Sequence, residues 1–261
     1  MKKELISHLR VLADRYETPR FTEGDPSCVL CRYSETADIE CAAFIAAMLA
    51  FGQRQQFLTK TDYIMALADS CGGPATWLRT GAYNKDFIPP NVAMDAKFYR
   101  FYSYRQLLDL FDKLGEILNQ ETNLGSYVKS RHQNFCEKNI SCGKPEPHLA
   151  ESLSSCFNGC RIVPQGMASA NKRIHMFLRW MVRQNSPVDI GLWSWYSPAN
   201  LIVPLDTHVV QEAIKLGLLP PKAVANAKTA KLLTEKLRQV WPQDPCRGDF
   251  ALFGNGVMAT L

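Results

Sequence analysis

Residues 170–187, with the sequence ANKRIHMFLRWMVRQNSP, carry apolar and cationic side chains at the spacing of an α-helix. On a wheel of about 3.6 residues per turn, Lys172, Arg179 and Arg183 fall together on one side, with Arg173 and His175 beside them. The opposite arc is apolar and consists of Ile174, Phe177, Leu178, Met181 and Val182. We therefore expect an amphipathic helix whose apolar face packs on a core and whose cationic face is exposed.

The surroundings of this helix are poor in negative charge. From residue 152 to residue 188 there is no Asp or Glu, whereas five Lys and Arg side chains occur there. The whole chain has 30 Lys and Arg against 25 Asp and Glu, a net charge of +5, so this segment holds as much positive charge as the entire excess. A solvated helix face is one explanation, but such faces usually mix both signs of charge. The phosphate backbone of a nucleic acid is the natural partner of such a patch.

Helical periodicity recurs along the rest of the chain, whereas the alternation typical of strands does not. The segment 38–52 is apolar on nearly all sides, which predicts a buried helix. The predicted fold class is all-α. The other expected helices lie at residues 1–16, 103–118, 123–139, 206–217, 224–240 and 249–261, with a short one among the loops of 141–169.

Composition places the chain among ordinary folded proteins, since 46% of its 261 residues are hydrophobic and 21% are charged. Its longest apolar run, residues 41–51, is far shorter than the roughly 20 residues that a membrane span requires. The first 16 residues alternate charge with Leu and Ile and lack the apolar core of a signal peptide. We expect a cytoplasmic protein.

Nine cysteines are unevenly spaced, and disulfides are not expected to persist in the cytoplasm. Cys28 and Cys31 form a CxxC pair, and Cys156 and Cys160 form a CxxxC pair. A zinc site built from these four thiols is an alternative, but the second CxxC or the paired histidines of a typical site are missing. We expect free thiols, some of them buried, with no metal and no cofactor.

Residues 199–221, ANLIVPLDTHVVQEAIKLGLLPP, contain a helix with clear start and stop signals. Pro204 precedes it, Asp206 stands at the N-cap position, and Gly217 follows its end. The simplest role for Asp206 is to accept backbone N–H bonds as a cap. The same cap would hold a carboxylate in a fixed orientation at the mouth of a helix, where a catalytic site could use it.

Together these two segments resemble a known superfamily. Lys172 followed by RIHMFLRW, and later VPLDTHV, resembles the helix-hairpin-helix DNA glycosylases, which include endonuclease III and the 8-oxoguanine DNA glycosylases. The segments FLRWMVR, PLDTHV, DPCRGDFALFGNG and DIECAAFIAAMLAFGQRQQ are also similar to a bacterial family known only as domain of unknown function 2400. The glycosylase hairpin reads roughly Leu-Pro-Gly-x-Gly-x-Lys, and the two glycine positions here hold Ala168 and Ala170, with Gly166 further upstream.

The resemblance implies a single glycosylase-like domain made of two helical lobes, with a helix-hairpin-helix-like element and a cleft between them. Lobe a would span about residues 36–200, and lobe b would combine about 1–35 with 201–261. The implied partner is double-stranded DNA that carries a damaged base, and the implied state is a monomer. The iron-sulfur cysteines of endonuclease III have no counterpart here, because only Cys246 lies near the C-terminal end.

The resemblance also implies a chemistry, which is DNA base excision with associated AP lyase activity. Lys172 would attack the sugar C1′ of a flipped nucleotide and form a Schiff base, and Asp206 would stabilise positive charge on the sugar or help to deprotonate the lysine. The implied candidates for stacking on the flipped base are Trp193, Trp195 and Tyr196. The implied DNA contacts are Arg173, Arg179, Arg183, His208, Gln53, Arg54 and Gln55.

An alternative of a different class stays open at this point. A protein could keep the helix-hairpin-helix glycosylase fold and bind DNA, or act as a scaffold, without catalysis. The altered hairpin is the feature that favours this alternative. The two hypotheses differ in what they require of Lys172, which must be a nucleophile in the first and only a cation in the second.

Overall fold

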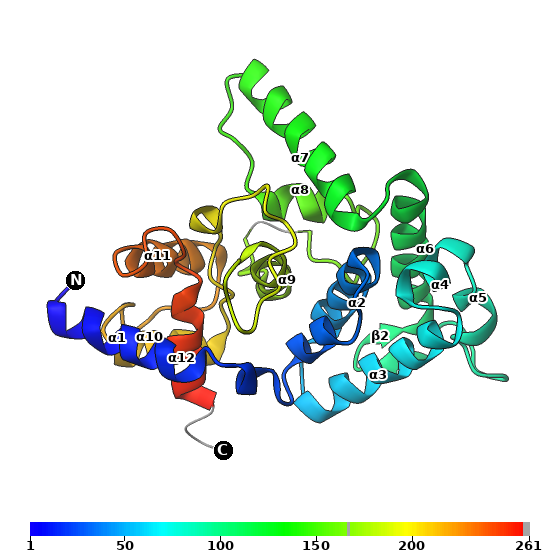
Figure 1. Ribbon diagram of the computed structural model, residues 1–261, viewed down its shortest axis with the longest axis horizontal. Helices are drawn as coiled ribbons and strands as arrows, with labels where there is room; N and C mark the ends of the chain where they lie inside the picture. The colour runs from blue at the N-terminus through cyan, green and yellow to red at the C-terminus, as the bar shows by residue number, and fades with distance from the viewer. Residues whose placement is uncertain (166–167, 258–261) are drawn as a thin grey trace. The chain divides into compact units, whose positions relative to one another are not determined.

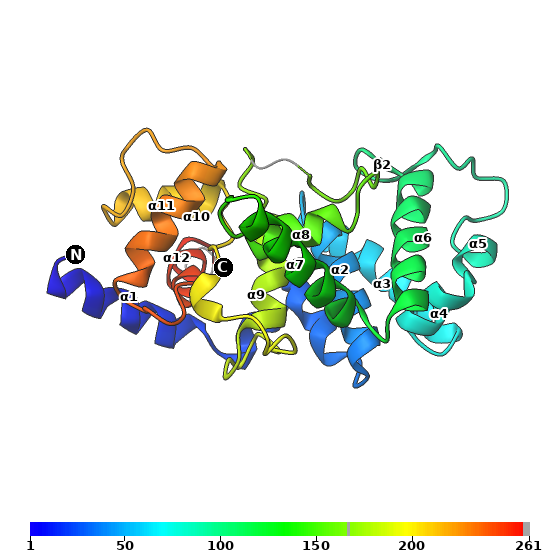
Figure 2. The ribbon, with the colours of Figure 1, turned by 90° about the horizontal axis from the view of Figure 1, so that it is seen from above.

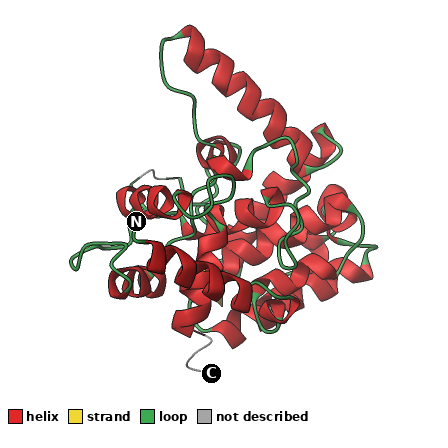
Figure 3. Cartoon of the chain, turned by 60° about the vertical axis from the view of Figure 1, so that its left-hand side comes forward, coloured by secondary structure: helices red, strands yellow, loops and turns green. Residues whose placement is uncertain are grey.

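The computed structural model describes residues 1–165 and 168–257, and the chain is mostly helical (Figure 3). The all-α prediction is confirmed. No helix in the described ranges is both long and apolar enough to cross a membrane. The elements in chain order are α1 (Lys3–Tyr16), η1 (Pro19–Thr22), η2 (Pro26–Cys31), α2 (Thr36–Leu49), α3 (Arg54–Ser70), α4 (Pro74–Thr80), α5 (Tyr83–Asp86), β1 (Lys97–Tyr99), β2 (Tyr102–Ser103), α6 (Tyr104–Gln120), α7 (Leu124–Ser141), α8 (Leu149–Ser155), α9 (Lys172–Val182), η3 (Pro198–Asn200), α10 (Thr207–Lys215), α11 (Ala227–Arg238) and α12 (Arg247–Val257).

The chain divides into two compact units. The terminal unit combines residues 1–23 with 166–261, and the central unit comprises residues 24–165. These boundaries differ from the lobes expected near residues 36 and 200, because α9 belongs with the two ends of the chain. The expected hairpin before α9 includes residues 166–167, which lie outside the described residues.

The terminal unit is built on the packing of α1 against α12, which join the two ends of the described chain (Figure 1). Helix α12 also packs on α10. Two glycines of α12 permit close approach, since Gly248 faces the side chain of Leu237 on α11 and Gly254 lies against the ring of Tyr16 on α1. The apolar arc predicted for α9 is buried, as expected.

The central unit is built around α2, which packs against η2, α3, α4 and α7. Its predicted burial on nearly all sides is confirmed, and two acids in its first two turns cap neighbouring helices. Asp38 Oδ1 accepts a hydrogen bond from the N–H of Ala75 at 2.7 Å, at the start of α4. Buried Glu40 Oε2 accepts one from the N–H of Gly125 at 2.9 Å, at the start of α7. Each carboxylate therefore faces the positive end of a second helix.

A short antiparallel hairpin, β1 and β2, precedes α6 and was not predicted. Its strands are three and two residues long, too short to show a period of two in the sequence. Ser103 then begins α6 with a capping box, because its hydroxyl accepts from the N–H of Gln106 and the Gln106 side chain accepts from the N–H of Ser103. In Figure 2, α6 runs beside α4 and α5.

The contact between α4 and α6 requires a glycine. A Cβ atom placed on Gly115 would lie 2.7 Å from the carbonyl oxygen of Leu78. We expect Gly115→Ala to lower the free energy of unfolding of the central unit, because overpacking costs about 1–3 kcal/mol and the gain in helix propensity is only about 1 kcal/mol. Urea denaturation followed by far-UV circular dichroism measures the difference. A more stable Gly115→Ala variant would show that the two helices can separate freely.

Candidate active site

Arg179 of α9 and Arg183, the residue that follows the helix at its C-cap position, are not surface residues. Their side chains are only 3% and 2% exposed. The prediction that they form an exposed cationic face and contact DNA is therefore wrong. Each guanidinium is instead surrounded by carboxylates, and both lie over the ring of Phe250, at 4.5 and 5.2 Å from its centroid.

Arg183 donates hydrogen bonds to three carboxylates and is the central residue of a buried ionic network. Its Nε donates to both oxygens of Asp244 at 2.9 Å, its Nη2 donates to Asp244 and to Glu17 at 2.7 Å, and its Nη1 donates to Asp189. Arg247 of α12 also donates to Glu17, at 2.8 Å. The network therefore ties α9 to the end of α1 and to the start of α12.

Arg179 makes the second part of the network. Its Nε donates to Asp189 at 3.2 Å and its Nη1 donates to Asp249 of α12. The acids were missed because none of them lies between residues 152 and 188. They come from residues 17, 189, 244 and 249, and only the folded chain brings them onto the cationic side of α9.

Glu17 provides a test of this network through its acid titration. Burial alone would raise the pKa of Glu17, but Arg183 and Arg247 hold it below its ordinary value of 4.5. Such a group stabilises the fold above pH 4.5, and this contribution is lost as the pH falls through the folded-state pKa. We expect the free energy of unfolding of Glu17→Gln to depend less on pH below 4.5 than that of the wild type. Urea denaturation at a series of acidic pH values measures both slopes, and equal slopes would contradict the assignment.

Lys172 and Asp206 are in direct contact. Lys172 Nζ lies 2.5 Å from Asp206 Oδ2, and the two side chains are 31% and 22% exposed. The predicted proximity of the two groups is confirmed, across 34 residues of sequence. Lys172 is the first residue of α9, and Asn171 before it has a left-handed backbone with φ of 45°. The Lys172 ammonium also lies 5.5 Å from the ring centroid of Phe253 on α12.

Asp206 performs two structural tasks with its two oxygens. Oδ1 accepts from the N–H of Val209 at 2.9 Å, so the predicted N-cap of α10 is confirmed. Oδ2 faces Lys172. Burial alone would raise the pKa of Asp206, but Lys172, the Val209 N–H and His208 hold it below its ordinary value. Asp206 is therefore an oriented carboxylate that stays ionised.

A second carboxylate near this pair escaped the sequence prediction. Asp249 is buried, and its burial raises its pKa to about 6 despite the opposing fields of Arg179 and Lys172. The negative charge of Asp206 also raises the pKa of Asp249, so the two carboxylates interact. No local sequence signal distinguishes Asp249, which stands among the apolar residues of α12. The environments of Asp206 and Asp249 push their pKa values apart, a pattern common in acid-base sites.

The three aromatic candidates differ in accessibility. Trp193 is 1% exposed and packs edge-on against Phe177 of α9 at 5.4 Å between ring centroids. The prediction that Trp193 stacks on a flipped base is therefore wrong, because its ring belongs to the core. Trp195 stacks on Trp193 at 5.6 Å, and both Trp195 and Tyr196 are half-buried. Both residues are therefore partly accessible to solvent.

The remaining predicted DNA contacts fall in both units. In the terminal unit, Arg173 is half-buried and directly follows Lys172. His208 is exposed, and it lies close enough to Asp206 to lower the pKa of that carboxyl group. In the central unit, Gln53 is the N-cap residue of α3 and is exposed, as is Gln55, with Arg54 half-buried between them. Their roles stay predictions.

The cysteines are all free thiols, as predicted, and four of them are buried. Within the described residues the structure does not group the two predicted cysteine pairs as metal ligands. It brings together His132, Cys136 and Glu146 instead, with one possible ligand atom of each within 4.8 Å of the others. His132 and Cys136 are four residues apart on α7, a spacing that could have indicated this group from the sequence.

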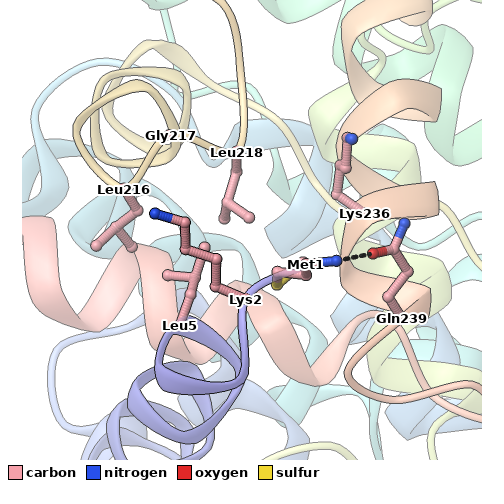
Figure 4. A pocket seen from close by; sticks show the side chains of 8 residues that line it. All are labelled: Met1, Lys2, Leu5, Leu216, Gly217, Leu218, Lys236 and Gln239. Carbon is pink, nitrogen blue, oxygen red and sulfur yellow. Dashed lines mark hydrogen bonds between the residues drawn. The ribbon is translucent and has the colours of Figure 1, made fainter.

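A pocket of the terminal unit lies away from these groups. It is formed where the start of α1 meets the end of α10 and the last turn of α11 (Figure 4). The N-terminal ammonium donates to Gln239 Oε1 at 3.2 Å at its edge. The pocket contains none of the predicted site residues. Its lining consists of Met1, Lys2, Leu5, Leu216, Gly217, Leu218, Lys236 and Gln239.

The family of the chain follows from a comparison with family models. A model described as "Protein of unknown function (DUF2400)" matches residues 25–258. The chain belongs to this family. No curated protein and no solved structure matches significantly. The predicted relation to the helix-hairpin-helix glycosylases stays a prediction.

Proposed function

We propose that this member of the DUF2400 family is a DNA glycosylase with associated AP lyase activity. The observation that carries the proposal is the contact between Lys172 Nζ and Asp206 Oδ2 at 2.5 Å. Both side chains keep a partly exposed surface, so a substrate can reach them. An amine beside an oriented carboxylate is the pair that Schiff-base chemistry at a sugar carbon requires.

In the proposed reaction Lys172 acts as the neutral amine. Its nitrogen forms a bond to C1′ of a flipped nucleotide while the bond from C1′ to the base breaks, and the base leaves with the bonding electrons and takes up a proton. Opening of the sugar ring gives an iminium between Lys172 and C1′. Loss of a proton from C2′ then expels the 3′ phosphate, and hydrolysis of the iminium releases the lysine.

Asp206 would act through its charge. Because its pKa is lowered, it is a weak proton acceptor and a good stabiliser of positive charge on the sugar. Its attachment to the N–H of Val209 fixes its orientation. Asp249, with a pKa of about 6, is the better candidate for accepting a proton near neutral pH.

The division of charge between the units supports a polyanionic substrate. The terminal unit has 16 Lys and Arg against 10 Asp and Glu, a net charge of +6, whereas the central unit has 14 against 15, a net charge of −1. The positive excess of the chain therefore lies in the unit that contains Lys172. Since Arg179 and Arg183 are neutralised in the core, the DNA-binding charge must come from other side chains of this unit.

The test is borohydride trapping on a duplex that contains an abasic site. This substrate bypasses the unknown base and probes only the Schiff base, which borohydride reduces to a stable covalent adduct. We expect an adduct with the abasic duplex, and then with at least one member of a panel of duplexes carrying oxidised purines or pyrimidines. DNA binding without any adduct would favour a non-catalytic DNA-binding protein, and the intact duplex serves as the negative control.

A further inference from the structure

His132, Cys136 and Glu146 of the central unit form a cluster that the proposed DNA chemistry does not use. Cys136 Sγ lies 3.7 Å from His132 Nε2 and 3.5 Å from Glu146 Oε1. We propose that these three side chains bind a Zn²⁺ ion, with a water molecule as the fourth ligand. The set of one nitrogen, one sulfur and one oxygen ligand suits Zn²⁺, whereas Mg²⁺ and Ca²⁺ take oxygen ligands.

Two of the three spacings between ligand atoms are compatible with a tetrahedral site. Zinc bonds of about 2.0–2.3 Å at tetrahedral angles place two ligand atoms roughly 3.3–3.7 Å apart. The two distances from Cys136 Sγ, at 3.7 and 3.5 Å, fall in this range. Sγ is also 3.9 Å from His132 Nδ1, which places it beside the imidazole ring and off the axis of the Nε2 lone pair. Binding would therefore require the Cys136 side chain to rotate, so that the metal lies on that axis.

A neighbouring hydroxyl orients the histidine. His132 is buried, and its Nδ1 lies 2.8 Å from Oγ of Ser152, a fully buried residue of α8. If Nδ1 carries the proton and donates it to Ser152, Nε2 keeps its lone pair for the metal. Histidine ligands of zinc generally have such a partner on the second ring nitrogen.

The chain after α7 is held so that Glu146 returns to the helix. Gly143 adopts a left-handed φ of 67° at the reversal. The N–H of Lys144 then donates to the carbonyl oxygen of Asn139 at 2.8 Å, and the Asn139 side-chain amide donates to the carbonyl oxygen of Pro145 at 3.0 Å. These bonds tether the segment that continues to α8, which lies against α7 in Figures 1 and 2.

The position of the cluster also explains what the ion would stabilise. The buried residues of α7 end at His132, so residues 133–141 form more than two turns of helix without a buried side chain. Helical stability in proteins comes mainly from packing of an apolar face, which this part of α7 lacks. A zinc ion held by α7 and the following segment would clamp the C-terminal half of α7 to the segment that leads to α8.

Cobalt substitution tests the site directly, because Co²⁺ bound to a thiolate has a charge-transfer absorption and intense visible bands when four-coordinate. Metal-free full-length protein is titrated with Co²⁺ and then with Zn²⁺, which should displace it one for one. We expect the absorption in the wild type and in Cys28→Ser/Cys31→Ser, which removes the exposed CxxC pair. We expect it to be lost in Cys136→Ser.

Zinc affinity gives the second readout. We expect Zn²⁺ to bind on the order of 100-fold more weakly to Cys136→Ser, and roughly 10-fold more weakly or worse to Glu146→Gln and Ser152→Ala. The matched controls are Cys142→Ser and Glu137→Gln, which remove an exposed thiol and an exposed carboxylate of the same region and should change affinity little. Circular dichroism confirms that each variant is folded.

Three results would overturn the proposal. The first is the absence of thiolate charge transfer in the wild type, and the second is its survival in Cys136→Ser. The third is its loss in Cys28→Ser/Cys31→Ser, which would move the ion to the CxxC pair. Hydrogen exchange adds a structural check, because zinc should slow exchange in residues 133–146 of the wild type and leave it unchanged in Cys136→Ser. None of these outcomes depends on DNA chemistry.

Discussion

Arg183→Ala is expected to lower the free energy of unfolding of the terminal unit by at least about 3–5 kcal/mol. That is the usual cost of removing one partner of a buried ion pair, and Arg183 serves Glu17, Asp189 and Asp244 at once. Without Arg183, the carboxylates of Glu17 and Asp189 lose an ionic partner, and water cannot replace it because both side chains are buried. Tryptophan fluorescence during urea denaturation measures the loss, since four of the five tryptophans lie in the terminal unit.

Two variants control this result. Lys231→Ala removes an exposed cation of α11 and should change stability by less than about 0.5 kcal/mol. Arg183→Lys should recover only part of the loss, because an ammonium cannot donate in the fixed forked geometry that reaches all three carboxylates. Two results together would contradict this assignment. Arg183→Ala would be as stable as the wild type, and the slope of its log K for DNA against log[salt] would be smaller by about one phosphate contact. Arg183 would then be a surface residue.

The error over Arg179 and Arg183 shows a limit of the helical wheel. The wheel separated the apolar arc from the cationic arc correctly, and the apolar arc is buried. It could not show that the cationic arc faces a second set of elements, because the acids lie at residues 17, 189, 244 and 249. A helix can therefore have an amphipathic sequence although both of its faces are buried. This occurs when the polar face is covered by ion pairs with other elements.

The candidate site was predictable where its signals are local. Pro204 and the N-cap position of Asp206 predicted the start of α10, and the structure confirms the cap. The contact between Lys172 and Asp206 spans 34 residues, and only the family resemblance suggested it. Asp249 had no local signal, because its importance arises from the burial of α12 beside α9.

The zinc ligands illustrate the same division. His132 and Cys136 lie one turn apart on a helix that was predicted, so their shared face follows from the sequence. Glu146 follows a chain reversal at Gly143, and its approach to Cys136 depends on the bonds that Asn139 makes to the segment. A loop that folds back onto the preceding helix in this way cannot be predicted from the hydrophobic periodicity of the sequence.

Lys172→Arg is expected to abolish borohydride trapping and strand cleavage while DNA affinity falls only modestly. A guanidinium keeps the positive charge and can still pair with Asp206, so the ionic contact and phosphate attraction are retained. It stays protonated at neutral pH and cannot act as a nucleophile, so no Schiff base can form. Trapping on the abasic duplex and a binding titration on the same duplex separate the two effects. Adduct formation by Lys172→Arg would place the nucleophile at another residue.

Asp206→Asn distinguishes the charge of Asp206 from its role as a cap. Asparagine caps helices as well as aspartate, so its side-chain oxygen can keep the bond to the Val209 N–H and the thermal stability should change little. The amide cannot stabilise positive charge on the sugar, so base release should slow by roughly 100-fold or more while trapping on a preformed abasic site is affected less. If both rates were unchanged, the carboxylate would be only a cap and a salt-bridge partner. If the variant unfolded, the cap would need the charge itself, and the separation of roles between the two oxygens would be wrong.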